Sequence, residues 1–138
     1  MLYGILAWGK SNSRNINKIK SLQRKILKLF PQHSTQRNKL LTFDNIYSYS
    51  SIIKMFTDIH KPSSYFHSKI TDLLPSHPHT TRHSSQFNFN LPDINLTQFK
   101  ASFLYNGIKI WNTLPSYIKN IENKSKLKKT LKLHLINQ

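Results

Sequence analysis

The sequence predicts a mainly α-helical protein: a small bundle of short helices, a polar loop and one short extended segment near residues 86–91. Three observations support this class. Apolar residues recur three and four positions apart in most of the chain, prolines close these stretches, and apolar residues alternate with polar ones around Phe87. A length of 138 residues suits a single domain, which we divide into a helical part (1–75), a loop and extended connector (76–100) and a second helical part (101–138).

The first long helix is predicted over residues 15–30. Its apolar face carries Ile16, Ile19, Leu22, Ile26 and Leu29. Ser13 or Asn15 could cap its start, and Pro31 ends it. The apolar face is expected to join the core, whereas the opposite basic face could line a phosphate groove or remain solvated. That basic face consists of Lys20, Arg24, Lys25 and Lys28.

Two further helices are predicted in the first half of the chain. One runs from about residue 45 to residue 60, is capped by Asp44 and stops before Pro62. Its apolar stripe consists of Ile46, Tyr49, Ile53, Phe56 and His60. We expect His60 to pack or snorkel on this stripe rather than to bind a ligand. A shorter helix is predicted over residues 64–74, before Pro75.

The middle of the chain changes in character. Residues 76–86 are polar and predict an exposed loop. Phe87, Phe89 and Leu91 alternate with asparagines, which is typical of a half-buried strand or extended segment. Residues 92–100 are expected to connect this segment to the second helical part.

The second helical part is predicted to contain two helices. The first spans residues 101–112 through Leu104, Ile108 and Trp111. Gly107 inside it costs roughly 1 kcal/mol relative to alanine, so another contact must hold that turn. Leu114-Pro115 ends this helix, because the residue before a proline is pushed to extended geometry. The last helix is expected over residues 125–136.

Charge is the strongest indication of function. The chain holds 21 lysines and arginines against 5 acidic residues, a formal net charge of +16, and no acidic residue precedes Asp44. Such a positive field attracts polyanions, and nucleic acid is the usual one. Lysine, asparagine and isoleucine are also favoured by an AT-rich genome, so a purely compositional origin of the charge stays open.

The predicted partner is therefore RNA or DNA, bound without sequence preference. Arg82 lies beside the hydroxyls of Thr80 and Thr81, and a guanidinium can donate two hydrogen bonds to one phosphate. Aromatic residues interleave with the basic ones and could stack on unpaired bases, although for Trp111 we expect a place in the core. The predicted binding residues are Lys20, Arg24, Lys25, Lys28 and Arg82.

Catalysis and metal binding find little support in the sequence. The acidic residues stand singly, so no carboxylate pair close in sequence could hold two metal ions for nucleotidyl transfer. Neither a glycine-rich phosphate loop nor a G-x-S-x-G elbow occurs. His77, His79 and His83 cluster, but no cysteine or nearby carboxylate accompanies them. We therefore predict no catalytic residue, no metal and no cofactor.

The chain opens with MLYGILAWGK, an apolar helical stretch with no residue to cap it. We expect residues 2–8 to be helical, with their apolar side chains exposed or resting on the 15–30 helix alone, and Met1 to be internal to a longer protein. The apolar run breaks at Lys10, far short of the ~20 residues that a membrane span needs. No membrane partner is therefore expected.

Several separate motifs resemble one family. They are Tyr3-Gly4 with Trp8-Gly9, Leu22-Gln23-Arg24-Lys25-Ile26, Thr81-Arg82, Trp111-Asn112-Thr113-Leu114-Pro115 with Ile118-Lys119, and a final lysine-rich leucine helix. In this order the chain resembles the C-terminal region of reverse transcriptases (RNA-directed DNA polymerases) from non-LTR, LINE-type retrotransposons, with the Jockey and CR1-like branch nearest.

The resemblance implies a mainly helical region downstream of the polymerase palm, which helps to hold template and primer and has no catalytic aspartates of its own. It implies structural anchors at Trp8, Trp111 and Pro115, and a missing palm and fingers as protein partner. The location stays unknown, with the cytoplasm or nucleus expected if the chain is expressed. Two alternatives stay open. The chain could be an auxiliary part of a polymerase whose palm lies on another chain, or a decayed remnant without independent function.

Overall fold

The computed structural model describes residues 4–10, 13–31, 40–75, 87–93 and 96–137. Its helices are α1 (Ile5–Trp8), α2 (Ser13–Lys28), α3 (Phe43–His60), α4 (His67–Thr71), α6 (Thr97–Lys100), α7 (Phe103–Asn112), α8 (Ser116–Lys119) and α9 (Lys124–Ile136). Within these ranges no residue forms a β-strand. The predicted fold class, a small and mainly α-helical bundle, is confirmed.

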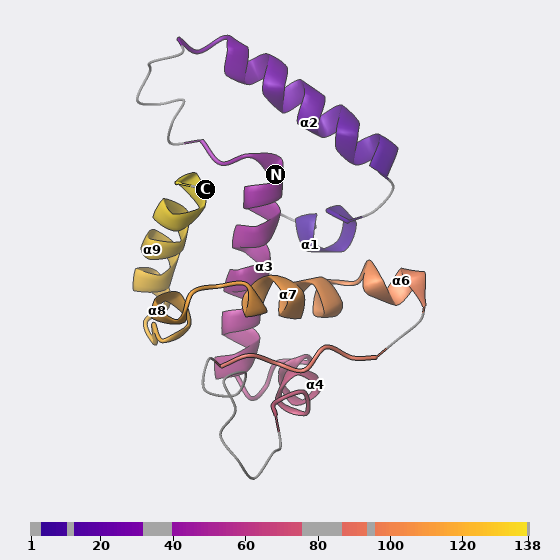
Figure 1. The fold of residues 1–138 in the computed structure, drawn as a ribbon, viewed down its shortest axis with the longest axis vertical. Coiled ribbons are helices and arrows are strands. Elements are labelled where there is room, and N and C mark those ends of the chain that lie inside the picture. Colours follow the sequence, from indigo (N-terminus) through magenta and orange to yellow (C-terminus); the bar gives the residue numbers. More distant parts are fainter. Residues whose placement is uncertain (1–3, 11–12, 32–39, 76–86, 94–95, 138) are drawn as a thin grey trace.

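Helix α3 is the central element. It runs through the middle of the molecule, with α9 alongside it and α7 crossing it (Figure 1). The Thr42 hydroxyl caps α3 by accepting a hydrogen bond from the Asn45 amide at 3.2 Å. The prediction that Asp44 caps this helix is therefore wrong: Asp44 lies in the first turn, because buried Phe43 already belongs to the helix.

The buried side of α3 is broader than one stripe. Its buried residues are Phe43, Tyr47, Ser51, Ile52, Met55, Phe56 and Asp58. The predicted stripe is wrong in part, because Ile46, Tyr49 and Ile53 are only half-buried. Helices α1, α4, α7 and α9 all contact α3, so its neighbours cover more than one of its faces.

The main core forms where α7 and α9 pack on α3. Its fully buried members are Ile52, Met55, Ile70, Ile108, Ile118, Leu127 and Leu131. Gly107 lies at the α3–α7 contact, where an added Cβ would stand 3.1 Å from the Met55 side chain. This close approach is the contact that holds the glycine-containing turn of α7.

Residues 87–89 are fastened to the end of α7 through side chains. The Trp111 indole nitrogen donates to the Phe87 carbonyl at 3.0 Å. The Asn112 amide exchanges two hydrogen bonds with the Phe89 backbone, at 2.9 and 2.8 Å. The segment forms no strand: Phe87 lies in a turn with a φ of +52°, and the backbone of Phe89 pairs with an asparagine side chain. Phe89 is 4% exposed and Phe87 is 61% exposed.

The structural anchors predicted in this region lie where the prediction put them. Trp111 is 3% exposed in the core. Helix α7 ends at Asn112, and Pro115 caps the start of α8. The proline therefore separates α7 from α8, as its fixed backbone geometry predicts.

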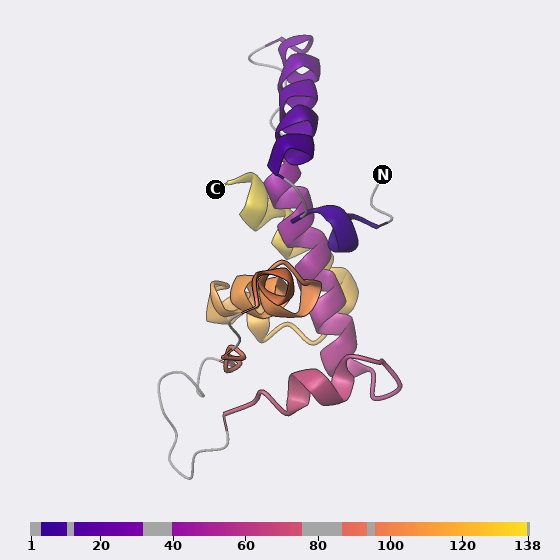
Figure 2. The ribbon, with the colours of Figure 1, turned by 90° about the vertical axis from the view of Figure 1, so that its right-hand side faces the viewer.

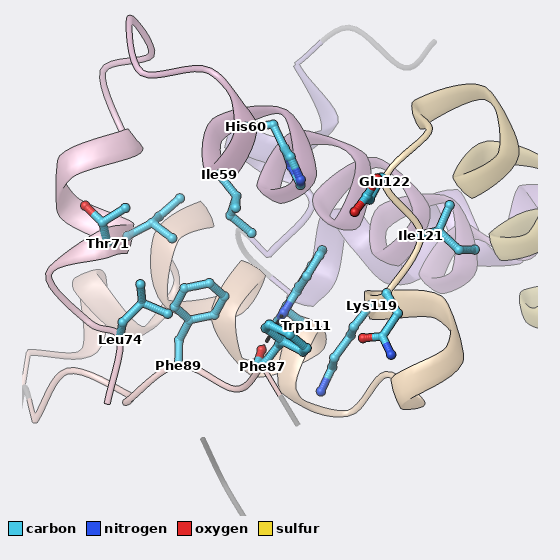
Figure 3. A pocket seen from close by; sticks show the side chains of 12 residues that line it. Ile59, His60, Thr71, Leu74, Phe87, Phe89, Trp111, Lys119, Ile121 and Glu122 are labelled. Atoms are coloured by element: carbon cyan, nitrogen blue, oxygen red, sulfur yellow. Dashed lines mark hydrogen bonds between the residues drawn. The ribbon is translucent and has the colours of Figure 1, made fainter. Parts of the chain in front are cut away.

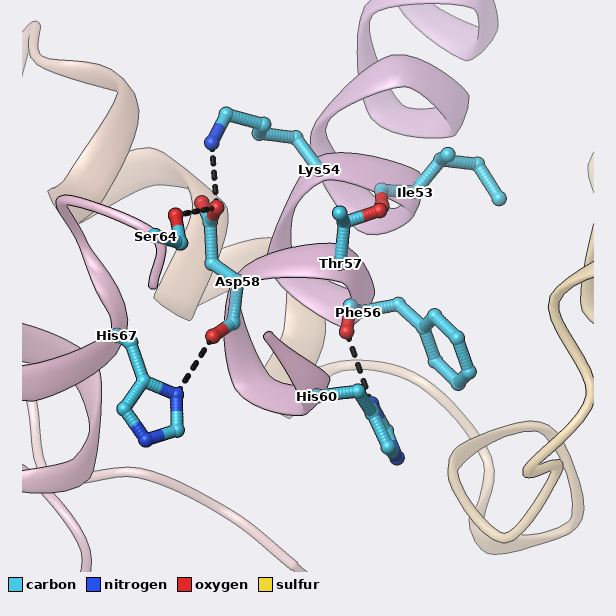
Figure 4. Close-up of polar contacts among 8 residues, drawn as sticks. All are labelled: Ile53, Lys54, Phe56, Thr57, Asp58, His60, Ser64 and His67. Carbon is cyan, nitrogen blue, oxygen red and sulfur yellow. Dashed lines mark hydrogen bonds and ion pairs between the residues drawn. The ribbon is translucent and has the colours of Figure 1, made fainter. Parts of the chain in front are cut away.

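A buried carboxylate shapes the turn after α3 (Figure 4). Asp58 is fully buried, and its carboxylate accepts hydrogen bonds from Lys54 and Ser64. The Asp58 carbonyl also lies 2.9 Å from Nδ1 of His67. These contacts fold residues 61–66 into turns, so α4 begins later and is shorter than the predicted 64–74 helix.

His60 ends α3 on the outer side of this turn. Its ring stacks on Phe56 at a centroid distance of 4.2 Å, and its Nδ1 lies 2.8 Å from the Phe56 carbonyl. The side chain is exposed yet packed on Phe56, as expected.

Helix α2 projects beyond the rest of the molecule (Figure 2). Apolar residues in and just after its distal part are open: Leu22 is 58% and Ile26 55% exposed, and Leu29, directly after the helix, is 83% exposed. The prediction that its apolar face joins the core is wrong, because no residue of α2 is buried. Only Ile16 and Ile19 pack partly against a cluster on α1 and α3.

Helix α1 packs on the N-terminal part of α3. Ile5 is 2% exposed and forms a small cluster with Phe43 and Tyr47. The Trp8 ring lies 5.8 Å from the Phe43 ring. The expectation that this stretch is exposed or rests on α2 alone is therefore wrong; Leu2 and Tyr3 lie outside the described residues.

A matched pair of substitutions on α9 tests this packing. Leu131 is fully buried and Leu133, two residues later, is 63% exposed. We expect Leu131→Ala to lower the free energy of unfolding by about 2–5 kcal/mol, through lost transfer energy and a cavity, and Leu133→Ala to change it by less than about 0.5 kcal/mol. Urea denaturation followed by circular dichroism measures both values. Equal effects of the two variants would contradict the packing of α9 on α3.

Candidate nucleic-acid interface

The predicted basic residues of α2 occupy its solvent side. Arg24, Lys25 and Lys28 are exposed, and α2 contains no acidic residue. Arg24 and Lys28 stand four residues apart, which places them about 6 Å apart along one side of the helix. The Arg24 Nε donates to the Lys20 carbonyl at 3.4 Å, so this side chain lies along the helix toward its start.

Lys20 has a different role from the other three. Its ammonium group lies 2.7 Å from the Asp44 carboxylate, and this ion pair joins α2 to the first turn of α3. Gln23 strengthens the same junction by donating to the Leu41 carbonyl and accepting from the Phe43 amide, each at 2.7 Å. Lys20 is therefore partly a structural residue, and the predicted phosphate contacts fall mainly to Arg24, Lys25 and Lys28.

A small polar pocket adjoins this junction. It has a volume of about 240 Å³ and lies between the end of α1, the start of α3 and α7. Its polar lining consists of Lys10, Asp44, Tyr47, Ser48, Asn106, Lys109 and Thr113. The two ammonium groups can donate hydrogen bonds to a phosphate, whereas the Asn106 amide and the Thr113 hydroxyl already donate to backbone carbonyls. Asp44 belongs both to this pocket and to the ion pair with Lys20.

Sequence reasoning missed Lys10 and Lys109 as a pair. They stand far apart in the chain and come together only because α1 and α7 both pack on α3. The Lys10 ammonium lies 5.4 Å from the centre of the Tyr47 ring, a cation–π contact that holds it over α3. The signal available in the sequence was the excess of basic residues alone.

Burial changes the acidity of three groups. Burial lowers the pKa of Lys119, whose ammonium donates to the Asn88 side chain and to the Asn112 carbonyl. Burial also raises the pKa of Tyr47 and that of Tyr49. Lys119 therefore serves the packing of residues 87–89, and it is not available as a surface phosphate contact.

Two groups of predicted residues lie outside the described part of the chain. These are Arg82, the fifth predicted binding residue, and the histidines His77, His79 and His83. Among the described residues, no group of three histidine, cysteine or acidic side chains could hold a metal ion. None of the described helices is long and apolar enough to cross a membrane.

Comparison with known proteins adds no assignment. No family model matches the chain, no curated protein matches it, and no solved structure matches it. The resemblance to retrotransposon reverse transcriptases therefore stays a prediction from the motifs, and the function has to be argued from the geometry described above.

The raised pKa of Tyr47 makes the burial of this side chain testable through the pH dependence of stability. Below pH 10 the tyrosine is protonated in both states; above it, the unfolded chain loses the proton first, so rising pH favours unfolding. We expect wild-type stability to fall more steeply above pH 10 than that of Tyr47→Phe, by up to about 1.4 kcal/mol per pH unit.

Urea denaturation at pH 8 and pH 10.5 measures this difference. Tyr117→Phe is the control for removal of a tyrosine hydroxyl from an exposed position, because Tyr117 is 58% exposed. Parallel pH dependence of all three proteins would show that Tyr47 is not buried as described.

Proposed function

We propose that this chain is a nucleic-acid-binding segment without catalytic residues of its own, and that it corresponds to the C-terminal region of a retrotransposon RNA-directed DNA polymerase. One observation carries the proposal. Helix α2 holds Arg24, Lys25 and Lys28 exposed, without an acidic residue in the helix, on an element that projects from the body (Figure 2).

The chemistry of this surface suits phosphates rather than base edges. Lysine ammonium groups contact phosphates as point charges, and the Arg24 fork can donate two parallel hydrogen bonds to one phosphate. Each phosphate that is neutralised releases bound counterions, which favours binding at low salt. Phosphate contacts fix position without reading sequence, so the expected binding is sequence-independent and salt-dependent.

The exposed apolar residues of α2 favour a second candidate function. Leu22 and Ile26, on the helix that bears the basic residues, and Leu29, directly after it, are each more than half exposed. Contiguous exposed apolar residues commonly mark a protein interface. This fits the alternative in which the chain is an auxiliary part of a polymerase whose palm lies on another chain, and α2 packs on that chain.

A salt titration tests the proposed binding surface. We expect Arg24→Gln/Lys25→Gln/Lys28→Gln to reduce the slope of log affinity against log salt by about 2, since each single-strand phosphate contact contributes about 0.7. Lys20 is left unchanged because it pairs with Asp44. Fluorescence anisotropy of a labelled single-stranded RNA at several salt concentrations measures the slope.

The matched control removes the same charge elsewhere. Lys126, Lys128 and Lys129 are exposed on α9, and their triple replacement by glutamine should change the slope by less than half as much. If both triple variants change the slope equally, net charge and not α2 governs binding. If the wild-type affinity does not depend on salt, phosphate binding itself is rejected.

A further inference from the structure

An apolar pocket on the face opposite α2 has no role in the proposed phosphate contacts. Its volume is about 510 Å³, and it lies among the end of α3, α4, the 87–89 segment and the α8–α9 connection (Figure 3). Phe87, Phe89 and Trp111 all line it, and Phe87 supplies most of the open aromatic surface, since the other two rings are almost fully buried. Pockets of 300–1,000 Å³ with mostly apolar walls and a few polar groups are typical of small-ligand sites.

The polar groups of this pocket come from different elements. His60 lies at the end of α3, Thr71 on α4, and Asn120 and Glu122 follow α8. His60 offers its Nε2, Asn120 an amide and Glu122 a carboxylate, which together can both donate and accept hydrogen bonds. The Thr71 hydroxyl already donates to the backbone of its own helix. Lys119 also lines the pocket, but its ammonium already donates to Asn88 and to the Asn112 carbonyl.

Phe87 is held in an unusual position beside the pocket. Its φ is +52°, a left-handed backbone conformation that bulky side chains rarely adopt. Hydrogen bonds from Trp111 and Asn112 fix the backbone at Phe87 and Phe89, and Lys119 holds the side chain of Asn88 between them. The surrounding contacts thus enforce a strained conformation that leaves the Phe87 ring 61% exposed.

These features fit a flat ligand with an apolar face and a polar edge. We propose that the pocket binds one unpaired nucleobase of the bound nucleic acid, stacked on the exposed Phe87 ring and hydrogen-bonded at its edge by the polar groups. The inference rests on the proposed nucleic-acid binding. Stacking of bases on aromatic side chains is the usual way in which proteins hold unpaired strands.

The alternative occupant is an apolar side chain from a protein partner. An aliphatic anchor would cover the aromatic surface but would make no hydrogen bond to the amide of Asn120 or the carboxylate of Glu122, which also line the pocket. A base satisfies both kinds of surface, so the lining of the pocket favours the base.

Binding of two matched RNA oligomers tests the proposal. One is a single-stranded uridine decamer, and the other has the same ribose-phosphate backbone without bases. At a salt concentration that suppresses most of the phosphate contribution, we expect the uridine decamer to bind about tenfold more tightly. Phe87→Ala should remove about tenfold of affinity for the uridine decamer and leave that for the abasic decamer unchanged, the size expected for one stacked base.

Tyr65→Ala is the control variant. Tyr65 is 73% exposed and does not line the pocket, so its loss should affect neither oligomer. Both substitutions remove exposed rings, and circular dichroism should show unchanged folding. Equal binding of the two oligomers to the wild type, or no effect of Phe87→Ala, overturns the base pocket; if salt-dependent binding then persists, the proposed function stands without it.

Tryptophan fluorescence provides a direct second measurement. In a Trp8→Phe background Trp111 is the single tryptophan, and it lines the pocket. Titration with uridine monophosphate should quench its emission saturably, and the quenching should weaken at least several-fold in Phe87→Ala. Quenching by N-acetyl-leucine amide with no effect of uridine monophosphate would overturn the base and assign the pocket to a protein side chain.

Discussion

The close approach of α7 to α3 at Gly107 is the contact on which the rest of the structure depends. A glycine there lets the Met55 side chain sit against the α7 backbone. The crossing sets the position of Trp111 and Asn112, one turn further along α7, and these two residues hold the 87–89 segment. The segment in turn supplies Phe87 and Phe89 to the apolar pocket. The contact between two helices thus decides where a surface site can form.

The periodicity of apolar residues predicted the fold class and most helices, because period and proline position act locally. The prediction of buried residues was wrong where the position of a neighbouring helix determines which side chains are covered. The apolar residues of the 15–30 stretch have the spacing of a core helix, yet Leu22, Ile26 and Leu29 are exposed. An amphipathic pattern identifies an apolar face, but it does not identify which element, if any, packs against that face. For α3 the periodicity predicted too few buried residues. Several neighbouring helices bury residues outside the single predicted stripe, including Ile52 and Met55. The Asp58 contacts that shorten α4 are likewise tertiary.

The candidate sites were predictable only in part. The basic residues of α2 follow directly from the sequence, and three of them lie exposed as expected. Lys10 and Lys109 line one pocket, and His60 and Glu122 line the other. Each of these sets joins positions far apart in the chain, so no local sequence pattern contains it. The alternation around Phe87 predicted extended structure, but the left-handed backbone of that residue is imposed by Trp111 and Asn112.

The attachment of α2 through Gln23 has a dynamic consequence. One side-chain amide joins this helix to residues 41–43 by two hydrogen bonds, and the accompanying Lys20–Asp44 pair is partly exposed and contributes little. Local stability follows buried apolar contact, and α2 buries no residue completely. Helix α2 therefore behaves as a separate cooperative unit whose amide protons exchange with solvent ahead of those of α3. An elongated anion bound along α2 would slow that exchange, because a ligand stabilises the folded state that it binds.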